Sequence, residues 1–170
     1  MEVKGLSWPF EDQLDAEGFK SYFLGNAAAF VVRAFPDQKD DGGKKCVQDI
    51  KSEVWGTFHI KTNFPGRCSH FCNGGFITDP RRRRRGVGKF MGFAFLKLAK
   101  DLGYKASYFN LVFRTNEASL RLWRTLGFTE LAVVPKAASL KGIEGLVDAI
   151  QFYYDLESLE EEDLPEHLRS

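Results

Sequence analysis

The chain has 170 residues, of which 44% are hydrophobic and 28% are charged; this balance is typical of one globular domain with a substantial core. Its 24 basic and 23 acidic residues leave a net charge of +1, so no overall charge draws the protein to nucleic acid or to a membrane surface. It has no hydrophobic stretch of the roughly eighteen residues that span a bilayer. We therefore expect a cytoplasmic protein with one domain over 1–156 and an acidic tail over 157–170.

Apolar residues and turn formers predict an antiparallel meander in the first half of the chain. The predicted elements are, in order, a short helix over 19–24, a strand over 27–33, a hydrophilic loop over 36–45, a second strand over 54–60, a turn over 63–66 and a third strand over 71–78. The third strand contains Gly74 and Gly75, and paired glycines often mark a bulge. A bulge would bring Asn73 and Phe76 to one face and open a gap beside the strand; a glycine-softened edge strand is the alternative.

Cys68, His70 and Cys72 alternate in this part of the chain and invite a zinc interpretation. In an extended segment their side chains share a face but lie about 6.5 Å apart, too far for one ion at ligand distances of about 2 Å. The odd number of cysteines provides no disulfide framework and suits a reducing compartment. We expect no metal site.

The second half alternates helices with strands, which predicts a right-handed parallel crossover. Apolar residues recur at helical spacing over 87–102, Gly103 ends this helix, and an apolar run over 106–113 predicts a strand buried on both faces. Asn116 is a good N-cap for another helix, which ends at Gly127. The remaining predicted elements are a strand over 130–134, a long connection over 135–148, a last strand over 149–156 and a polar tail from 159 that is solvated or a marginal helix.

Asn110 is a polar residue inside the predicted buried strand. A buried amide without partners costs about 1–3 kcal/mol. Either a neighbouring loop provides its hydrogen bonds, or the amide points at a polar substrate in a cleft.

Five consecutive arginines, 81 to 85, precede Gly86 and Gly88 at the start of the predicted helix. A helix N-terminus offers unpaired N–H groups and the positive end of its dipole, and guanidinium groups bind phosphate well. The junction lacks the P-loop pattern and the third glycine of the dinucleotide fingerprint. It predicts a pyrophosphate site; a nuclear-localisation signal, a nucleic-acid patch and a solvated turn are the alternatives.

Two motifs resemble those of the GCN5-related N-acetyltransferases (GNAT). The segment that grips the pyrophosphate of acetyl-CoA is similar to Arg83-x-x-Gly86-x-Gly88. The helix along its pantetheine arm and thioester is similar to Asn116-x-x-Ser119-x-x-Leu122-Trp123-x-x-Leu126-Gly127-Phe128. The resemblance implies an α/β (α+β) GNAT fold: a mixed central sheet with an antiparallel amino-terminal meander, splayed central parallel strands and flanking helices. Since the hairpin starts at residue 27, we expect the family's amino-terminal layer to be reduced or trimmed.

A closer resemblance is to the fungal acetyltransferases that N-acetylate L-azetidine-2-carboxylate and related proline-like imino acids; it rests on residues 58–70, 72–76 and 109–113. In that family two asparagines and a phenylalanine line the substrate pocket, and they match Asn73, Phe76 and Asn110. The resemblance implies direct transfer of an acetyl group from acetyl-CoA, the co-substrate, to a small amino or imino acid. The alternatives are a different acceptor, such as a polyamine or a protein N-terminus, and a non-catalytic acetyl-CoA-binding regulator.

The site prediction follows from these segments. The residues predicted to bind acetyl-CoA are Phe76, Ile77, Arg83, Arg84, Arg85, Gly86, Val87, Gly88, Lys89, Asn116, Ser119 and Trp123. The residues predicted to act in catalysis are Asn110, Asn73 and His59, and those predicted to bind the acceptor are Asn73, Phe76 and Asn110. Backbone N–H groups over 75–77 are expected to stabilise the oxyanion.

The proton transfers remain open in the sequence. Candidates for taking the proton of the amine are His59, Glu53, Asp79 or a chain of waters. Trp123 replaces the tyrosine that the family uses to protonate the leaving thiolate, and an indole cannot supply that proton at neutral pH. The thiolate then leaves unassisted, or Tyr108, Tyr153 or water protonates it. The expected partner is the small-molecule amine, without nucleic acid or membrane, and residues 135–156 are a candidate homodimer contact.

Overall fold

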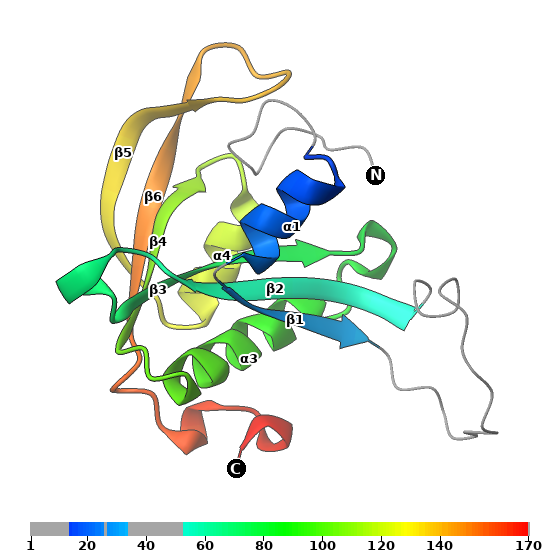
Figure 1. Cartoon of the computed structure of the whole chain (residues 1–170). Helices are drawn as coiled ribbons and strands as arrows, with labels where there is room; N and C mark the ends of the chain where they lie inside the picture. Colours follow the sequence, from blue (N-terminus) through cyan, green and yellow to red (C-terminus); the bar gives the residue numbers. More distant parts are fainter. Residues whose placement is uncertain (1–13, 26, 34–52, 170) are drawn as a thin grey trace.

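The computed structural model describes residues 14–25, 27–33 and 53–169, and the predicted loop over 36–45 lies outside these ranges. A six-stranded sheet forms its centre (Figure 1). In sheet order the strands are β1 (Ala27–Arg33), β2 (Val54–Thr62), β3 (Phe71–Thr78), β4 (Ala106–Phe113), β6 (Leu146–Asp155) and β5 (Thr129–Ser139). The α-helices of the described residues are α1 (Ala16–Leu24), α3 (Val87–Asp101) and α4 (Glu117–Thr125), and short 3₁₀ helices lie at Gly66–Cys68, Pro80–Arg82, Glu161–Asp163 and Glu166–Leu168. None of the helices in these ranges combines the length and the hydrophobicity that a membrane span requires.

The pairing of the strands confirms the predicted mixed sheet. β1, β2 and β3 form an antiparallel meander, and β3 and β4 are parallel neighbours joined through α3. β4, β6 and β5 pair antiparallel. Parallel neighbours need a long connection, which here is the helix that covers one face of the sheet.

α1 covers part of the opposite face. Its N-cap is Asp15, whose side chain accepts a hydrogen bond from the Gly18 N–H at 2.7 Å. Because of this cap, the helix begins at Ala16 rather than at the predicted residue 19. The buried Phe23 packs edge-on against His59 of β2, with 5.0 Å between the ring centroids.

The main core lies between the sheet and α3. Met91 and Phe95 of α3 are almost completely buried against β2 and β3, and Leu96 is equally buried in the same core. Gly74 of β3 lies directly under this helix, since a Cβ on it would be 2.5 Å from a ring carbon of Phe95. The missing side chain at Gly74 therefore permits α3 to approach the sheet closely.

β3 has no bulge against β2, so this prediction is wrong. The pairs run from Gly56–Thr78 to Thr62–Cys72 without a register shift. The close packing of α3, and not a bulge, explains the glycine at position 74. Asn73 and Phe76 therefore point to opposite faces of the sheet. The Phe76 ring packs against α3, whereas Asn73 lies on the face that α1 partly covers.

β5 and β6 form a longer hairpin than predicted. Most of the predicted connection over 135–148 belongs to these two strands. A register shift between Val134 and Ala138 lets β5 continue past Pro135, which has no N–H to donate to the ladder. The predicted strand over 130–134 is thus the first part of a longer one.

The tail packs along α3, so the prediction of a solvated tail is wrong for its apolar residues. Leu159 and Leu164 are buried in the main core. Lys100 of α3 donates a hydrogen bond to the Leu159 carbonyl, and His167 stacks on Phe90 with 5.7 Å between the ring centroids. Spaced leucines thus hold a segment whose overall composition is acidic. The domain boundary at 156 stays a prediction.

Replacing Gly74 with alanine should lower the free energy of unfolding by about 1–3 kcal/mol, because the added methyl group overpacks the contact with Phe95. Gly88→Ala is the matched control, since its Cβ would meet only Leu122 at 3.8 Å and alanine has the higher helix propensity by about 0.5–1 kcal/mol. Urea unfolding of both variants measures the difference. Equal stability of the two variants would contradict the close-packing explanation.

Candidate active site

β3 and β4 separate after a short parallel contact. They pair only at Phe71–Ala106 and Cys72–Ser107, and the described residues that follow form no pair across the gap. The predicted splay of the central parallel strands is therefore confirmed. Backbone groups on the facing edges of both strands are left for a ligand.

The separation accompanies an irregularity in β4 and not in β3. β4 pairs regularly with β6 up to Phe109–Phe152, and the register has shifted by one residue at Val112–Ile150. Residues 110–111 thus both oppose Gln151 as a bulge. A bulge bends its strand and leaves one residue unpaired, which explains how β4 turns away from β3.

The backbone N–H of Phe76 points into the gap. The N–H of Asn63 donates to the Phe71 carbonyl at 2.8 Å, so these two residues form a hydrogen-bonded pair of the β2–β3 ladder. Such pairs recur at every second residue of an antiparallel ladder. Phe76, paired with Phe58, occupies an intermediate position, so its N–H is directed away from β2. It lies within the range 75–77 that was predicted to supply oxyanion donors.

Asn73 and Asn110 come together through a third asparagine. Asn63 Oδ1 accepts hydrogen bonds from Nδ2 of Asn73 at 3.2 Å and from Nδ2 of Asn110 at 2.8 Å. Asn63 Nδ2 donates to Oδ1 of Asn110 at 3.1 Å. The three half-buried side chains form an asparagine cluster at the closed end of the gap.

Asn63 was missed as a site residue because asparagine is common in turns. The signal was nevertheless present, since Asn63 lies within the segment 58–70 that carries the closer resemblance. Its position beside Asn73 follows only from the β2–β3 register.

Phe76 and Trp123 meet on the other face of the sheet. Their ring centroids are 4.9 Å apart, and Trp123 is 4% exposed and also packs on Phe109 at 4.6 Å. The structure therefore does not place the Phe76 ring beside Asn73 and Asn110. Only the backbone of Phe76 faces the gap that these asparagines close.

The arginine run forms the bend between β3 and α3. Arg81 pairs with Asp79 at 2.7 Å, and the Arg82 guanidinium lies over the Trp55 ring at 5.2 Å. Residues 83–85 are exposed, and no acidic side chain of the described ranges forms an ion pair with them. Their positive charge is therefore available to an anion.

The bend exposes the N-terminus of α3. Arg84 and Gly86 both have left-handed backbone angles, with φ of 61° and 79°. Gly86 is the N-cap and contributes no side-chain hydrogen bond to the first turn, whose N–H groups have no intrahelical partners. The residues present therefore fit a pyrophosphate group, which these N–H groups and the helix dipole would bind.

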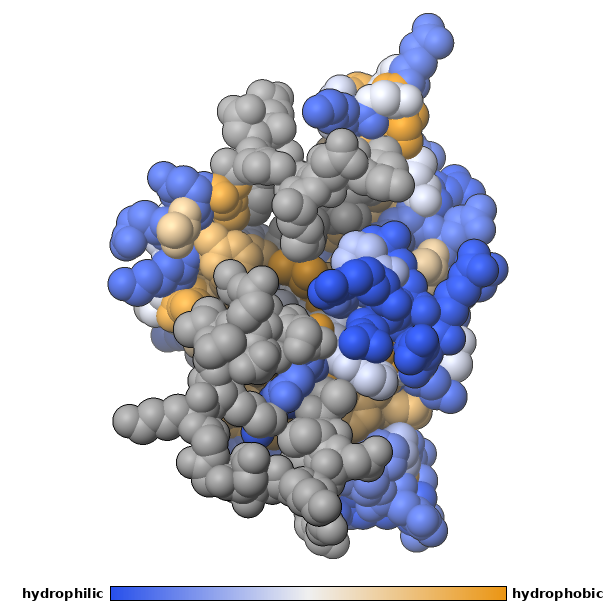
Figure 2. All heavy atoms as spheres, turned by 90° about the vertical axis from the view of Figure 1, so that its right-hand side faces the viewer, coloured by the Kyte–Doolittle hydropathy of each residue, from blue (hydrophilic) through white to orange (hydrophobic). Residues whose placement is uncertain are grey.

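Figure 2 shows the side of the molecule on which this bend lies. Hydrophilic side chains gather there beside a recessed group of hydrophobic side chains. α4, whose N-cap Asn116 accepts a hydrogen bond from the Ser119 N–H at 3.3 Å, begins just after β4 as α3 begins just after β3. The positive ends of both helices thus follow the carboxyl ends of the diverging strands.

His59 is buried in the sheet beneath α1. Its side chain is 1% exposed, its ring lies against Phe23 and Tyr22, and its Nδ1 has no hydrogen-bond partner in the described ranges. Burial, and to a lesser degree the charge of Lys61, lowers its pKa to about 4. His59 is therefore neutral at physiological pH and a weak base.

The other predicted proton carriers differ in their surroundings. Asp79 accepts hydrogen bonds from Arg81, which lower its pKa and make it a poor proton acceptor. Tyr108 and Tyr153 lie on the same face as the asparagine cluster, where both rings approach Phe71 at about 6.5 Å between centroids. They thus share a face of the sheet with the asparagine cluster, whereas Trp123 lies on the other face.

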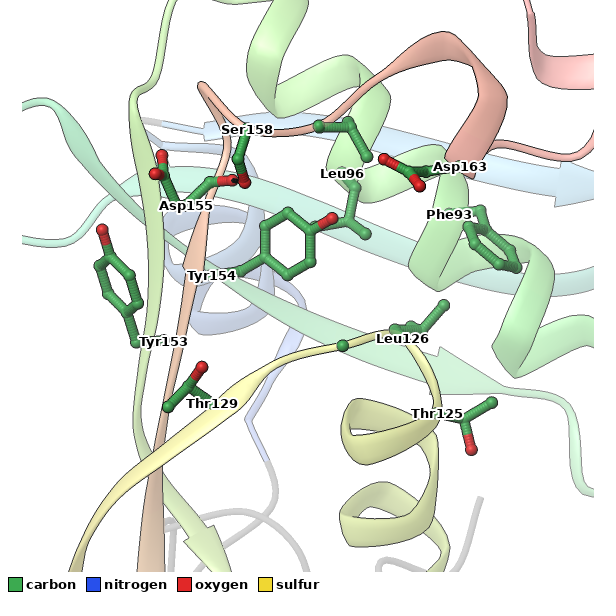
Figure 3. A pocket seen from close by; sticks show the side chains of 12 residues that line it. Phe93, Leu96, Thr125, Leu126, Thr129, Tyr153, Tyr154, Asp155, Ser158 and Asp163 are labelled. Carbon is green, nitrogen blue, oxygen red and sulfur yellow. Dashed lines mark hydrogen bonds between the residues drawn. The ribbon is translucent and has the colours of Figure 1, made fainter.

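A separate cavity of about 490 Å³ lies between the second half of α3, the end of α4 and the tail (Figure 3). None of its lining residues was predicted to bind coenzyme or acceptor, although Tyr153, a predicted candidate for protonating the thiolate, is one of them. Burial, with added contributions from Asp163 and Asp155, raises the pKa of Tyr154 in its wall. Because these carboxylates repel phosphate, this cavity is unsuited to coenzyme A, and the gap beside the arginine bend is the better site.

Comparison with known proteins agrees with this fold. The sequence profile of the Acetyltransferase (GNAT) family matches residues 7–128. The chain belongs to this family.

Two curated proteins show the relationship in sequence. The chain is 49% identical over 113 residues to N-acetyltransferase aca1 of Schizosaccharomyces pombe, covering 66% of this chain and 54% of that protein. It is 29% identical over 186 residues to Protein SPT10 of Saccharomyces cerevisiae, covering 89% of this chain and 29% of that protein. The chain thus spans about half of the first relative and less than a third of the second.

Solved structures share the fold at low sequence identity. A GCN5-related N-acetyltransferase from Kribbella flavida superposes with a TM-score of 0.73 and 24% identity, covering 89% of this chain and 83% of that one. A GNAT superfamily phosphinothricin acetyltransferase from Sinorhizobium meliloti, solved in complex with AcCoA, gives a TM-score of 0.55 and 16% identity, covering 62% of this chain and 56% of that one.

Burial of His59 should make the protein less stable in acid. The unfolded chain binds a proton at this residue near pH 6.5 and the folded protein only near pH 4, so stability falls as the pH drops through this window, by about 3 kcal/mol at most. His59→Phe should lose less stability than the parent between pH 7 and pH 4.5 in urea unfolding. His167→Phe, at an exposed position, is the control, and a parent-like pH dependence of His59→Phe would contradict the assignment.

Proposed function

We propose that this chain is an N-acetyltransferase that transfers the acetyl group of acetyl-CoA to the amine of a small amino or imino acid. The observation that carries the proposal is the gap between β3 and β4, closed at one end by the asparagine cluster and followed at the other by the arginine bend. Such a gap admits an extended thioester with its phosphates at one end and the acceptor at the other. The name of the relative aca1, an N-acetyltransferase, supports the same reaction class.

The coenzyme would be held at the N-terminus of α3. The N–H groups of residues 85–89 bind its pyrophosphate, and the unpaired arginines at 83–85 screen the phosphate charge. Asn116 and Ser119, on the β4 side of the gap, lie along the pantetheine arm. The acetyl-CoA carried by the Sinorhizobium meliloti relative is consistent with a site of this kind.

The reaction is direct attack of the acceptor nitrogen on the thioester carbonyl. A new C–N bond forms, the C–S bond breaks, and coenzyme A leaves as a thiolate. The Phe76 N–H, directed into the gap, stabilises the oxyanion of the tetrahedral intermediate, and a donor of this kind contributes about 3–4 kcal/mol.

Proton removal from the amine falls to water in this proposal. His59 lies beneath α1 and has a pKa of about 4. This pKa is far below that of an ammonium group, so His59 is a poor base for the acceptor. We therefore assign His59 a packing role beside the site. The thiolate, with a pKa near 8.5 in solution, leaves unassisted or takes a proton from Tyr108, Tyr153 or water.

The acceptor class rests on the cluster and on the closer resemblance. Asn73 and Asn110 orient the amine and the carboxylate of the acceptor, as their matches in the imino-acid acetyltransferases do. Azetidine-2-carboxylate and proline analogues are therefore the first acceptors to test. Cytoplasmic location and a homodimer contact through the β5–β6 hairpin remain predictions.

A thiol-release assay with acetyl-CoA tests the function directly. The panel holds L-azetidine-2-carboxylate, 4-hydroxyproline, spermidine and a peptide with a free N-terminus. We expect turnover with the amino-acid-like acceptors. Faster turnover of spermidine or of the peptide would assign a different acceptor, and coenzyme A binding without turnover of any amine would indicate a regulator.

Gly86→Ala should weaken coenzyme A binding by about tenfold, because alanine disfavours the left-handed angle that shapes the bend. Gly142→Ala is the matched control: its φ is 77°, its surroundings are equally open, and it lies in the distant β5–β6 turn. Both variants should lose about 1 kcal/mol of stability. Isothermal titration that finds the same affinity loss in both variants would remove the bend from the coenzyme site.

Asn110→Ala should lower kcat/KM for the acceptor by about tenfold or more, since it removes two hydrogen bonds of the cluster. Coenzyme A affinity should stay within about twofold of the parent, because the arginine bend lies at the other end of the gap. Steady-state kinetics and titration on the same preparation measure both quantities. Parent-like acceptor kinetics would show that Asn110 is outside the acceptor pocket.

A further inference from the structure

Asn63 occupies the central position of the asparagine cluster. It is the only one of the three that contacts both others, through its Oδ1 to Asn73 and Asn110 and through its Nδ2 to Asn110. Its backbone is anchored as well, because its N–H donates to the Phe71 carbonyl at 2.8 Å. The next residue, Phe64, packs on Phe71 and Tyr108 with ring centroids 6.0 and 5.9 Å apart.

A single backbone group dictates which way the amides of the cluster point. The Gly74 N–H donates to the side chain of Asn73 at 2.7 Å, and an N–H can only meet the amide oxygen there. Asn73 must therefore turn its NH₂ group toward Asn63, whose side-chain oxygen accepts the hydrogen bond. Since that oxygen also receives Asn110 Nδ2, Asn63 turns its NH₂ group to the oxygen of Asn110.

This arrangement leaves more donors than acceptors for a ligand. The three NH₂ groups carry six N–H bonds, of which the hydrogen bonds within the cluster use three; the oxygen of Asn63 is saturated, while those of Asn73 and Asn110 each keep one lone pair. Lys61, the cross-strand partner of Asn73, adds a positive charge on the same face, with its ammonium over the Tyr22 ring at 4.3 Å. The cluster thus favours an anionic group with several lone pairs, and it disfavours a second ammonium group.

We propose that Asn63 is a positioning residue of the acceptor site: its amide fixes the orientation of Asn73 and Asn110 so that their free N–H groups meet the carboxylate of the acceptor. The inference rests on the proposed function and deepens it. Asn63 would then help the enzyme to distinguish amino acids from polyamines without touching the acceptor, through its hydrogen bonds to Asn73 and Asn110.

The test compares three variants on paired acceptors. Asn63→Ala removes all three hydrogen bonds, and Asn63→Asp keeps both acceptor contacts but brings a negative charge to the cluster. Thr62→Val is the matched control: Thr62 is next to Asn63 in the chain, and its hydroxyl bonds to the hydroxyl of Tyr104, at 3.0 Å, outside the cluster. The acceptors are L-azetidine-2-carboxylate and its carboxamide, and binding of each to the protein loaded with coenzyme A is also measured by calorimetry.

For Asn63→Ala we expect the KM for the carboxylate acceptor to rise about tenfold or more, with the KM for acetyl-CoA within about twofold of the parent. For Asn63→Asp the carboxylate acceptor should lose at least about tenfold more kcat/KM than the carboxamide, since two negative charges then face each other. Thr62→Val should match the parent. A purely structural role would weaken both acceptors equally.

Equal losses for carboxylate and carboxamide, or parent-like KM values in both Asn63 variants, would overturn the inference while leaving the acetyltransferase assignment intact. If the parent turns over neither acceptor, the proposed function fails, and calorimetry alone then tests the positioning role of Asn63. Carboxylate binding that is weakened in Asn63→Ala and not in Thr62→Val supports its positioning role, and unchanged binding contradicts it.

Discussion

The parting of β3 from β4 is the constraint on which the rest of this molecule depends. Two neighbouring parallel strands would ordinarily pair along their length, and here they pair at two positions only. The bulge at 110–111 bends β4, while β3 stays in register with β2 and packs closely under α3 through Gly74. One regular strand and one bent strand therefore create a gap, and backbone N–H and C=O groups on its edges are available to bind a ligand.

Electrostatics divide this gap into two ends with different tasks. At the open end, positive charge is concentrated by the N-terminus of α3 and by the exposed arginines 83–85, which form no ion pair within the described ranges. At the closed end, neutral amides provide directed hydrogen bonds. In the proposed function, the charge at the open end attracts the coenzyme with little demand on geometry, whereas the amides at the closed end recognise an acceptor only when each one is correctly oriented.

The orientation of the amides shows how backbone structure reaches side-chain chemistry. Gly74 is a glycine because α3 packs on it, and its N–H also sets the direction of every hydrogen bond in the asparagine cluster. A glycine that packing requires thus also fixes the orientation of the three amides. His59 of the neighbouring strand β2 is kept neutral by its burial beneath α1, on the opposite face of the sheet, and this agrees with the proposal that water takes the proton of the amine.

Much of the fold was determined by the sequence itself. Hydrophobic periodicity located β3, α3 and β4 within a residue. The predicted N-cap of α4, Asn116, is also confirmed, since its side-chain oxygen accepts a hydrogen bond from the first turn. Only the tertiary structure decided four features: the location of the bulge, the opposite faces of Asn73 and Phe76, the burial of the tail and the hydrogen bonds of Asn63 to Asn73 and Asn110. Each of these features depends on contacts between residues far apart in the sequence, such as strand pairing and its register. Periodicity along the chain does not report such contacts.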